Sequence, residues 1–208
     1  MGLQDYLKPL PFCAVLRGIT PQEIPSVAEA LVGEGFRILE VPLNSPQPFE
    51  SIRLLAQRCP DALVGAGTVL RVDDVARVRE AGGNVIVMPH ADLAVVREAK
   101  RLGLVCMPGV ATPTEAFAAL DAGADALKMF PVEALPPAAL RAWRAVLPRG
   151  TIVFAVGGMK PDTLAPYWGA GADGFGTGSN LYAPGTPAAD VRKAAAAYAA
   201  AFRALPAR

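Results

Sequence analysis

The chain has 208 residues, of which 52% are apolar, and its formal net charge at pH 7 is +1. This length and apolar content are sufficient for one domain with a sizeable core. A nearly neutral chain lacks the concentrated positive charge with which proteins bind nucleic acid or an anionic membrane, so neither is an expected partner.

The cysteine pattern and the first residues bear on the compartment. Cys13, Cys59 and Cys106 are widely spaced, and none belongs to a CxxC motif. This pattern is typical of reduced, packed thiols rather than of a disulfide framework or a zinc site. Residues 1–12 lack the basic-then-apolar run of a signal peptide, and no apolar run reaches the length of a membrane span. We therefore expect a cytoplasmic protein without a metal site.

Short apolar runs alternate along the chain with longer amphipathic segments. The runs predict strands at residues 14–17, 37–43, 62–66, 85–89, 105–110, 126–131, 152–157 and 174–177. Strands that alternate with helices through short loops indicate a parallel sheet, and a set of eight favours a closed barrel over an open doubly wound sheet. We predict an α/β fold, a single (β/α)8 TIM barrel that occupies residues 1–208 as one domain.

The predicted helices have clear start and stop signals. Residues 20–23 and 112–115 each place a threonine at the N-cap, a proline at N1 and a glutamate at N3, which is a capping box. Several predicted helices end at a glycine: Gly35, Gly82, Gly103, Gly123 and Gly171. A last amphipathic helix is predicted by the apolar stripe Val191, Ala194, Ala195, Tyr198 and Phe202.

In a TIM barrel the active site lies at the C-terminal ends of the strands and in the loops that follow them. One candidate there, Lys128, interrupts an apolar predicted strand between Leu127 and Met129. Burial disfavours the ammonium and lowers its pKa, and the neutral amine is the form that makes a Schiff base with a carbonyl. The alternative is a strand-end lysine whose amine reaches solvent.

A second candidate is Glu40, an acidic residue inside another apolar predicted strand. If Glu40 faces the barrel interior, Leu39 and Val41 face the helices. Arg17, at the end of the first strand, could grip a substrate carboxylate or phosphate with its planar fork. It could also only neutralise Glu40 in a buried ion pair. A carboxylate, an arginine and a lysine at one barrel mouth favour a functional site.

Two glycine clusters end the last two predicted strands, at residues 157–158 and 174–180. In TIM barrels these loops often bind phosphate through backbone N–H groups, and glycine lets the backbone come close to the anion. The pair predicts a phosphorylated ligand. Two further polar residues are weaker candidates: His90 has no evident partner and is predicted to lie in a pocket wall or loop, and Lys160 is predicted to lie at the surface.

Six motifs follow one another in order between Leu16 and Gly158, and the similarity that they carry extends from about residue 11 to residue 185. They are Leu16-Arg17-Gly18-Ile19-Thr20, Glu40-Val41-Pro42-Leu43-Asn44-Ser45-Pro46, Gly65-Ala66-Gly67-Thr68-Val69-Leu70, Pro108-Gly109-Val110-Ala111-Thr112, Leu127-Lys128-Met129-Phe130-Pro131 and Phe154-Ala155-Val156-Gly157-Gly158. Together they resemble the KDPG/KDPGal aldolase family of class I aldolases. The branch that acts on the 6-phosphogluconate derivative usually has threonine, arginine and a Pro-Thr pair where this chain has Pro42, Asn44 and Ala155-Val156. These departures match the branch that cleaves 2-dehydro-3-deoxy-6-phosphogalactonate.

The resemblance implies a mechanism. Lys128 would form a protonated imine with the C2 ketone, and Glu40, through a water, would take the C4 hydroxyl proton so that the C3–C4 bond breaks. The products would be pyruvate and D-glyceraldehyde 3-phosphate. Arg17 and Thr68 would orient the carboxylate end. The phosphate would be held by Gly158, Gly178 and Ser179. The resemblance also implies a homotrimer that needs no metal or other cofactor, since the imine is the electrophile.

Discrimination between the C4 epimers is expected at Val156 and Asn44. A threonine at position 156 could bond one orientation of the C4 hydroxyl, and Val156 has the same shape without the donor. The alternatives are the same reaction on the 6-phosphogluconate epimer, a sugar-phosphate epimerase or isomerase that would need Glu40 but not Lys128, and a non-catalytic phosphate-binding barrel.

Overall fold

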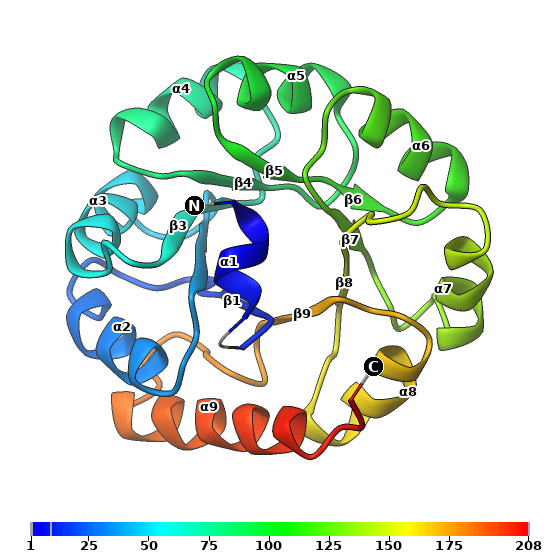
Figure 1. Cartoon of the computed structure of the whole chain (residues 1–208). Helices are drawn as coiled ribbons and strands as arrows, with labels where there is room; N and C mark the ends of the chain where they lie inside the picture. Colours follow the sequence, from blue (N-terminus) through cyan, green and yellow to red (C-terminus); the bar gives the residue numbers. More distant parts are fainter. Residues whose placement is uncertain (1, 9, 208) are drawn as a thin grey trace.

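The structure is a computed structural model that describes residues 2–8 and 10–207. A ring of strands is enclosed by a ring of helices (Figure 1). Within the described residues, nine strands form one sheet in the order β5-β4-β3-β2-β1-β9-β8-β7-β6. Because only Pro108 separates β5 from β6, these two strands take one position in the ring. The predicted single (β/α)8 barrel is confirmed.

The predicted strands are all present, with small differences in their bounds. The strands are β1 (Phe12–Val15), β2 (Ile38–Pro42), β3 (Leu63–Gly67), β4 (Val85–Val87), β5 (Val105–Met107), β6 (Gly109–Val110), β7 (Leu127–Met129), β8 (Val153–Val156) and β9 (Gly174–Thr177). The first strand starts earlier than predicted because pairing with β9 begins at Phe12, which lies opposite Phe175. The predicted strand 105–110 is interrupted at Pro108, since proline has no N–H for the ladder.

The helices follow the strands around the ring. They are α1 (Leu3–Leu7), α2 (Ile24–Gly33), α3 (Pro48–Arg58), α4 (Val72–Glu80), α5 (Leu93–Arg101), α6 (Pro113–Asp121), α7 (Pro137–Arg144), the 3-10 helix η1 (Pro161–Thr163), α8 (Leu164–Gly169) and α9 (Ala188–Arg203). In the predicted C-terminal stripe, Val191, Ala195 and Tyr198 of α9 are buried, and Phe202 packs at its edge.

One predicted capping box is confirmed, and at the other only the glutamate half is present, where Glu23 Oε2 accepts from Thr20 N at 2.9 Å. At α6, the Thr112 hydroxyl accepts a hydrogen bond from Glu115 N at 3.3 Å, and Glu115 Oε2 accepts one from Thr112 N at 2.9 Å. The second helix begins at Ile24 rather than at residue 21. There the Thr20 hydroxyl donates to Glu23 Oε2 at 2.7 Å instead of capping the helix, because the Glu23 carboxylate lies beside it.

The predicted glycine stops are confirmed. All five glycines have left-handed backbone conformations, with φ from 72° at Gly103 to 106° at Gly171. An L-residue with a side chain adopts this conformation only at a cost, so glycine is the favoured residue at the helix ends.

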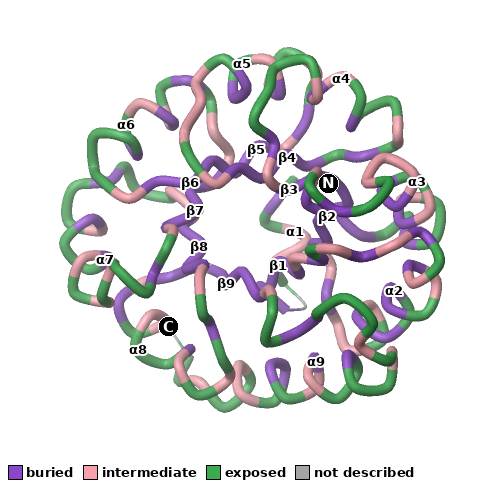
Figure 2. Tube along the Cα trace, turned by 180° about the vertical axis from the view of Figure 1, so that it is seen from behind, coloured by how far each residue is buried: buried purple, intermediate pink, exposed green. Residues whose placement is uncertain are grey.

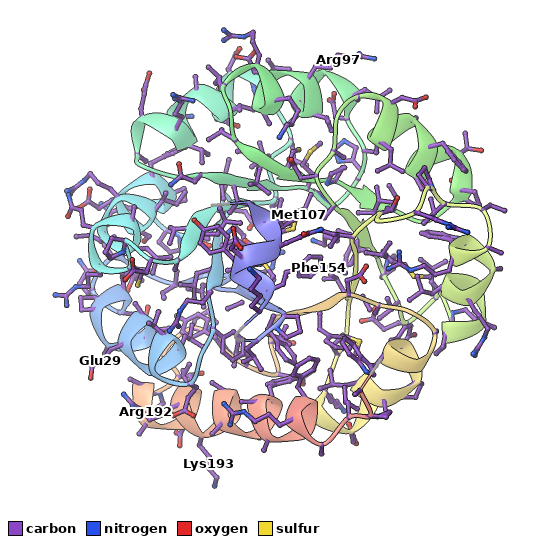
Figure 3. The ribbon with its side chains drawn as sticks, viewed as in Figure 1. Glu29, Arg97, Met107, Phe154, Arg192 and Lys193 are labelled. Atoms are coloured by element: carbon purple, nitrogen blue, oxygen red, sulfur yellow. The ribbon has the colours of Figure 1, made fainter. Side chains whose placement is uncertain are left out.

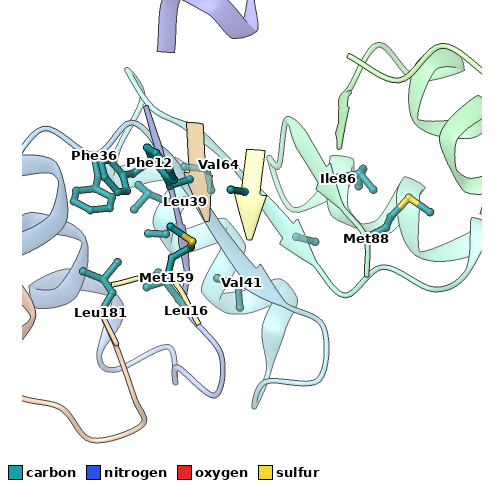
Figure 4. Packing of buried hydrophobic residues seen from close by; sticks show 14 of the residues in the cluster. Phe12, Leu16, Phe36, Leu39, Val41, Val64, Ile86, Met88, Met159 and Leu181 are labelled. Atoms are coloured by element: carbon teal, nitrogen blue, oxygen red, sulfur yellow. The ribbon is translucent and has the colours of Figure 1, made fainter. Parts of the chain in front are cut away.

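The apolar residues form two layers. The larger lies between strands and helices and includes Phe12, Leu39 and Val41 (Figure 4). The smaller fills the barrel interior, where Met107 and Phe154 lie in the centre of the ring (Figure 3). Figure 2 shows the strands as a buried ring and the outer faces of the helices as exposed. Helix α1 lies across one end of the barrel (Figure 1), so that end is closed.

The cysteine prediction is confirmed as far as packing is concerned. Cys13, Cys59 and Cys106 are free, buried thiols. Burial raises the pKa of Cys106 to about 12 and that of Cys13 further. In the part of the chain that the structure describes, no helix is both long and apolar enough to cross a membrane.

Candidate active site

A cleft of about 290 Å³ opens at the C-terminal ends of the strands. Most of the predicted site residues line it: Arg17, Thr68, Lys128, Val156, Gly158, Gly178 and Ser179. Asn44 and Glu40 are not part of its lining: Asn44 is hydrogen-bonded to Arg17, and Glu40 is buried. The fold therefore brings together residues that are up to 162 positions apart, from Arg17 to Ser179.

Lys128 lies in β7, opposite Gly109 of β6 and Phe154 of β8. Its neighbours Leu127 and Met129 belong to the layer between strands and helices, so Lys128 faces the barrel interior. The residue is 8% exposed, and the alternative of a lysine that reaches solvent is wrong. Burial lowers the pKa of the amine, against the attraction of Glu40. The ammonium form would also face the Phe130 ring, whose centroid is 4.7 Å from Nζ.

Glu40 lies in β2 and is 1% exposed. As predicted, Leu39 and Val41 pack in the outer layer, so the carboxylate points inward. Its Oε2 atom is buried and has no hydrogen-bond partner among the described residues. Burial raises the pKa of Glu40 to about 7, against the opposing charges of Lys128 and Arg17.

Gly67 makes room for this carboxylate, and the sequence reasoning did not single it out. A Cβ at Gly67 would lie 1.8 Å from Glu40 Oε2, so any larger residue would occupy the same space. The signal was present in the Gly65-Ala66-Gly67-Thr68 motif, because glycine inside a strand often marks a close approach.

Arg17 makes its hydrogen bonds with Asn44 and Thr68. One guanidinium nitrogen donates to Asn44 Oδ1 at 2.7 Å and the other to the Thr68 hydroxyl at 3.4 Å. Within the described chain, these are the side-chain partners of its fork, and the alternative in which Arg17 only neutralises Glu40 is wrong. Thr68 lines the cleft and has a φ of 54°. This backbone conformation is costly for a β-branched residue, as is common at functional sites.

The two glycine clusters meet at the cleft. Asn180 Nδ2 donates to the Met159 carbonyl at 3.1 Å, and this bond joins the loop after β9 to the loop after β8. The Tyr198 hydroxyl of α9 donates to the same carbonyl at 2.7 Å. The loops that carry Gly158 and Ser179 are therefore held together by one carbonyl oxygen.

Three polar residues near the site have other placements. His90 is exposed in the loop after β4, as predicted, and its neighbour Pro89 lines the cleft instead. Lys160 is exposed at the start of η1, so its predicted surface position is confirmed. Glu133, which the sequence reasoning missed, lines the cleft next to Gly157 and Gly158.

Comparison with known proteins places this arrangement in a family. The family described as KDPG and KHG aldolase matches residues 3–195. The chain belongs to this family. The aldolase is 47% identical to a probable 2-dehydro-3-deoxy-6-phosphogalactonate aldolase of Rhizobium meliloti, over 94% of this chain and 92% of that one. It is 45% identical to the 2-dehydro-3-deoxy-6-phosphogalactonate aldolase of Escherichia coli, over 93% and 95%.

Solved structures agree with these relatives. The "Native KDPGal structure" superposes on this aldolase with a TM-score of 0.92 at 45% identity, and covers 93% of this chain and 95% of that one. A KDPG aldolase of Legionella pneumophila with pyruvate captured as a covalent carbinolamine has a TM-score of 0.78 at 25% identity, over 95% and 94%. The predicted family is confirmed, and the enzyme is a carbon–carbon lyase of the aldolase class.

Proposed function

We propose that this enzyme is a Schiff-base aldolase that cleaves 2-dehydro-3-deoxy-6-phosphogalactonate to pyruvate and D-glyceraldehyde 3-phosphate. The observation that carries the proposal is the pair of oppositely charged, buried groups Lys128 and Glu40 at the barrel mouth. Burial lowers the pKa of Lys128 and raises that of Glu40, so it favours the neutral form of both groups. Shifts of this kind are typical of groups that take part in chemistry rather than in a structural ion pair.

Lys128 is the proposed nucleophile. Its lowered pKa increases the fraction of neutral amine, which attacks the C2 ketone of the substrate to give a carbinolamine. The acid form of Glu40 protonates the carbinolamine hydroxyl, which leaves as water, and the protonated imine that remains is the electron sink for the bond between C3 and C4. The apolar cavity below Lys128, lined by Met107 and Phe154, keeps water from the inner side of the amine.

Glu40 is the proposed general base. Through a water molecule, its carboxylate takes the proton of the C4 hydroxyl, the C3–C4 electron pair moves into the imine, and glyceraldehyde 3-phosphate leaves. The proton then held by Glu40 returns to C3 of the enamine, and hydrolysis of the imine releases pyruvate and the free Lys128 amine. A pKa of about 7 suits both steps, because the group both accepts and returns a proton near neutral pH.

The cleft lining offers polar groups for both ends of the substrate. Arg17 and Thr68, already joined by a hydrogen bond, present donors for the carboxylate. The phosphate is proposed to lie against Gly158, Gly178 and Ser179. This assignment uses the same backbone approach that phosphate-binding loops of TIM barrels use after their last two strands.

Val156 and Asn44 are the proposed specificity residues. Val156 lines the cleft with an apolar side chain, and Asn44 orients Arg17 through its 2.7 Å hydrogen bond. The competing substrate is the 6-phosphogluconate epimer. More distant relatives are named for this substrate. One is the KHG/KDPG aldolase of Escherichia coli, which is 34% identical over 68% of this chain and 66% of that one.

The remaining expectations are part of the same proposal. We propose that residues 1–208 act as one domain, that the enzyme needs no metal or other cofactor, that it is cytoplasmic, and that it assembles as a homotrimer without nucleic acid or membrane partners. Light scattering at micromolar protein tests the assembly, since a monomer mass would contradict the trimer.

Reduction with borohydride in the presence of pyruvate tests the function. The imine proposal expects one reduced pyruvate adduct per chain, located by mass spectrometry at Lys128. The variant Lys128→Met should lose the adduct, and the matched variant Lys160→Met, altered at an exposed lysine, should keep it. An adduct at Lys160 would contradict the assignment of Lys128. No adduct at all would contradict the imine chemistry and would favour an isomerase or a non-catalytic phosphate-binding barrel.

A further inference from the structure

The carboxylate of Glu23 joins two loops that are distant in sequence. Its Oε2 atom accepts hydrogen bonds from the backbone N and the hydroxyl of Thr20, at 2.9 and 2.7 Å. Its Oε1 atom accepts one from the Tyr182 hydroxyl at 2.9 Å and one from the backbone N of Gly185 at 3.0 Å. One side chain in the loop after β1 thus binds the loop after β9.

The segment held in this way begins at the proposed phosphate site. The Gly178 carbonyl accepts hydrogen bonds from Leu181 N at 2.7 Å and Tyr182 N at 3.0 Å, so residues 178–182 form a tight turn. On its N-terminal side the turn follows β9, where Thr177 is paired with Ala14 of β1. On its C-terminal side the turn ends at Tyr182, which is 1% exposed and is bound by Glu23.

The loop after β1 and the loop after β9 also contact each other at Gly18 and Pro184. A Cβ at Gly18 would lie 2.6 Å from Pro184 Cγ, so the loop after β1 passes directly under the loop after β9. A second cavity, of about 410 Å³, lies between them and shares Arg17, Gly178 and Ser179 with the cleft. A change in how the loops are joined would therefore reach the lining of the proposed phosphate site.

We infer that Glu23 is a positioning residue for the phosphate: it holds residues 178–185 against the loop after β1, so that Gly178 and Ser179 meet the phosphoryl group. This inference rests on the proposed function. Hydrogen bonds to a carboxylate are stronger than those between neutral groups. The two from Tyr182 and Gly185 hold the loop after β9, and the two from Thr20 hold the carboxylate itself in place. Glu23 itself does not line the cleft, so its effect on the ligand is indirect.

The test compares phosphorylated and unphosphorylated substrate in Glu23→Gln. Glutamine has one acceptor oxygen in place of two, and its amide nitrogen only donates, so it cannot accept from Thr20 and from Tyr182 and Gly185 at once. In one amide orientation the bonds to the loop after β9 are lost, and in the other the bonds that hold the side chain in place are lost. We expect KM for 2-dehydro-3-deoxy-6-phosphogalactonate to rise roughly tenfold, with kcat within about twofold of wild type. For the unphosphorylated sugar acid, kcat/KM should not change. The reduced pyruvate adduct should form as in wild type, since Lys128 is untouched.

Two further variants keep the test decisive. Tyr182→Phe removes one of the four hydrogen bonds and should raise the same KM by a smaller factor, even if Glu23→Gln folds poorly. Glu29→Gln, on the exposed face of α2, is the matched control and should behave as wild type, because its 3.7 Å ion pair with Arg192 is exposed.

The outcomes separate this inference from the proposed function. If wild type prefers the phosphorylated substrate but KM does not change in either Glu23→Gln or Tyr182→Phe, the positioning role is wrong and the proposed function stands. If both substrates lose kcat/KM equally, Glu23 only supports the fold, and the inference is also wrong. If wild type does not prefer the phosphorylated substrate, the phosphate site itself is wrongly placed, and the inference fails with it.

Discussion

The two ends of the barrel differ in whether their partly or wholly buried carboxylates have hydrogen-bond partners. At the N-terminal end, Asp125 Oδ2 accepts hydrogen bonds from Lys100 Nζ at 2.6 Å and from Cys106 N at 2.8 Å. Asp173 does the same with Arg144 and with Val153 N. At the C-terminal end, Glu40 Oε2 has no hydrogen-bond partner in the described chain.

The difference separates what holds the barrel together from what the site can do. A carboxylate that is paired and hydrogen-bonded fastens the start of a strand, and it has little capacity left for a ligand. A buried carboxylate without a partner costs folding free energy, and it stays available to bind or move a proton. Variants at the C-terminal end should therefore change mainly activity, and variants at the N-terminal end should change mainly stability.

The largest effect is expected from Lys128→Met. Loss of the amine removes the covalent step, so kcat/KM for cleavage should fall by more than about 10⁴-fold. Stability should not fall, because a buried amine is replaced by an apolar side chain of similar length. Steady-state kinetics and a thermal melt measure both, and Lys160→Met is the control. Retention of more than a few per cent of wild-type activity would contradict the role of Lys128.

Glu40→Gln should have the next largest effect. Removing the general base should lower kcat by roughly 10²–10⁴-fold while the amide keeps the shape of the carboxylate. Adduct formation with pyruvate should persist, since Lys128 remains. A variant that keeps wild-type kcat would show that another group takes the C4 proton.

Glu40 also predicts a dependence on pH. Its folded pKa of about 7 is raised above the ordinary value of 4.5, so between these values the folded chain binds the extra proton and stability falls as pH rises. Activity that needs the ionised base should rise through about pH 7 over the same window. Glu40→Gln should remove both trends in thermal melts and pH–rate profiles. Parallel profiles in wild type and variant would contradict this prediction.

Gly178→Val tests the phosphate side of the mouth. Among the described residues, a Cβ at Gly178 would have only Val15 within 4 Å, at 3.9 Å, so the fold has room for a side chain. That side chain would occupy the space proposed for the phosphate. We expect KM for the phosphorylated substrate to rise roughly tenfold or more, with a thermal melt close to wild type. An unchanged KM would mean that the phosphate lies elsewhere.

Val156→Thr should have a smaller effect, confined to the choice of epimer. Wild type should have the higher kcat/KM for the galactonate-derived substrate, because Val156 offers no donor to the C4 hydroxyl of the gluconate epimer. The threonine should move the ratio toward the gluconate epimer by on the order of 1–3 kcal/mol. A wild-type preference for the gluconate epimer would refute the branch assignment and leave the aldolase chemistry standing.

The smallest effect on activity is expected at the other end of the barrel. Asp125→Ala removes the partner of Lys100 and of Cys106 N, and should lower the free energy of unfolding by about 1–2 kcal/mol. Because Asp125 is not part of the cleft lining, kcat and KM should stay within about twofold of wild type. Denaturant unfolding and kinetics on the same sample measure this, and a large loss of kcat would contradict the separation of the two ends.

The sequence by itself determined the barrel and the inward direction of its two buried ionisable groups. Alternation along a strand is local, so the apolar neighbours Leu39 and Val41 are sufficient to turn Glu40 inward, and Leu127 and Met129 do the same for Lys128. Helix stops at glycine are local in the same way, because they depend on the backbone conformation of one residue.

Only the tertiary structure decided which charges are paired. Residues 20–23 have the local pattern of a capping box, but Tyr182 and Gly185, which lie 159 and 162 residues away, make Glu23 a link between two loops. Likewise Arg17 bonds Asn44 and Thr68 rather than Glu40, whose carboxylate instead fills the space beside Gly67. Local patterns report interactions within one turn or strand step, whereas pairing and burial depend on neighbours that only the closed barrel brings together.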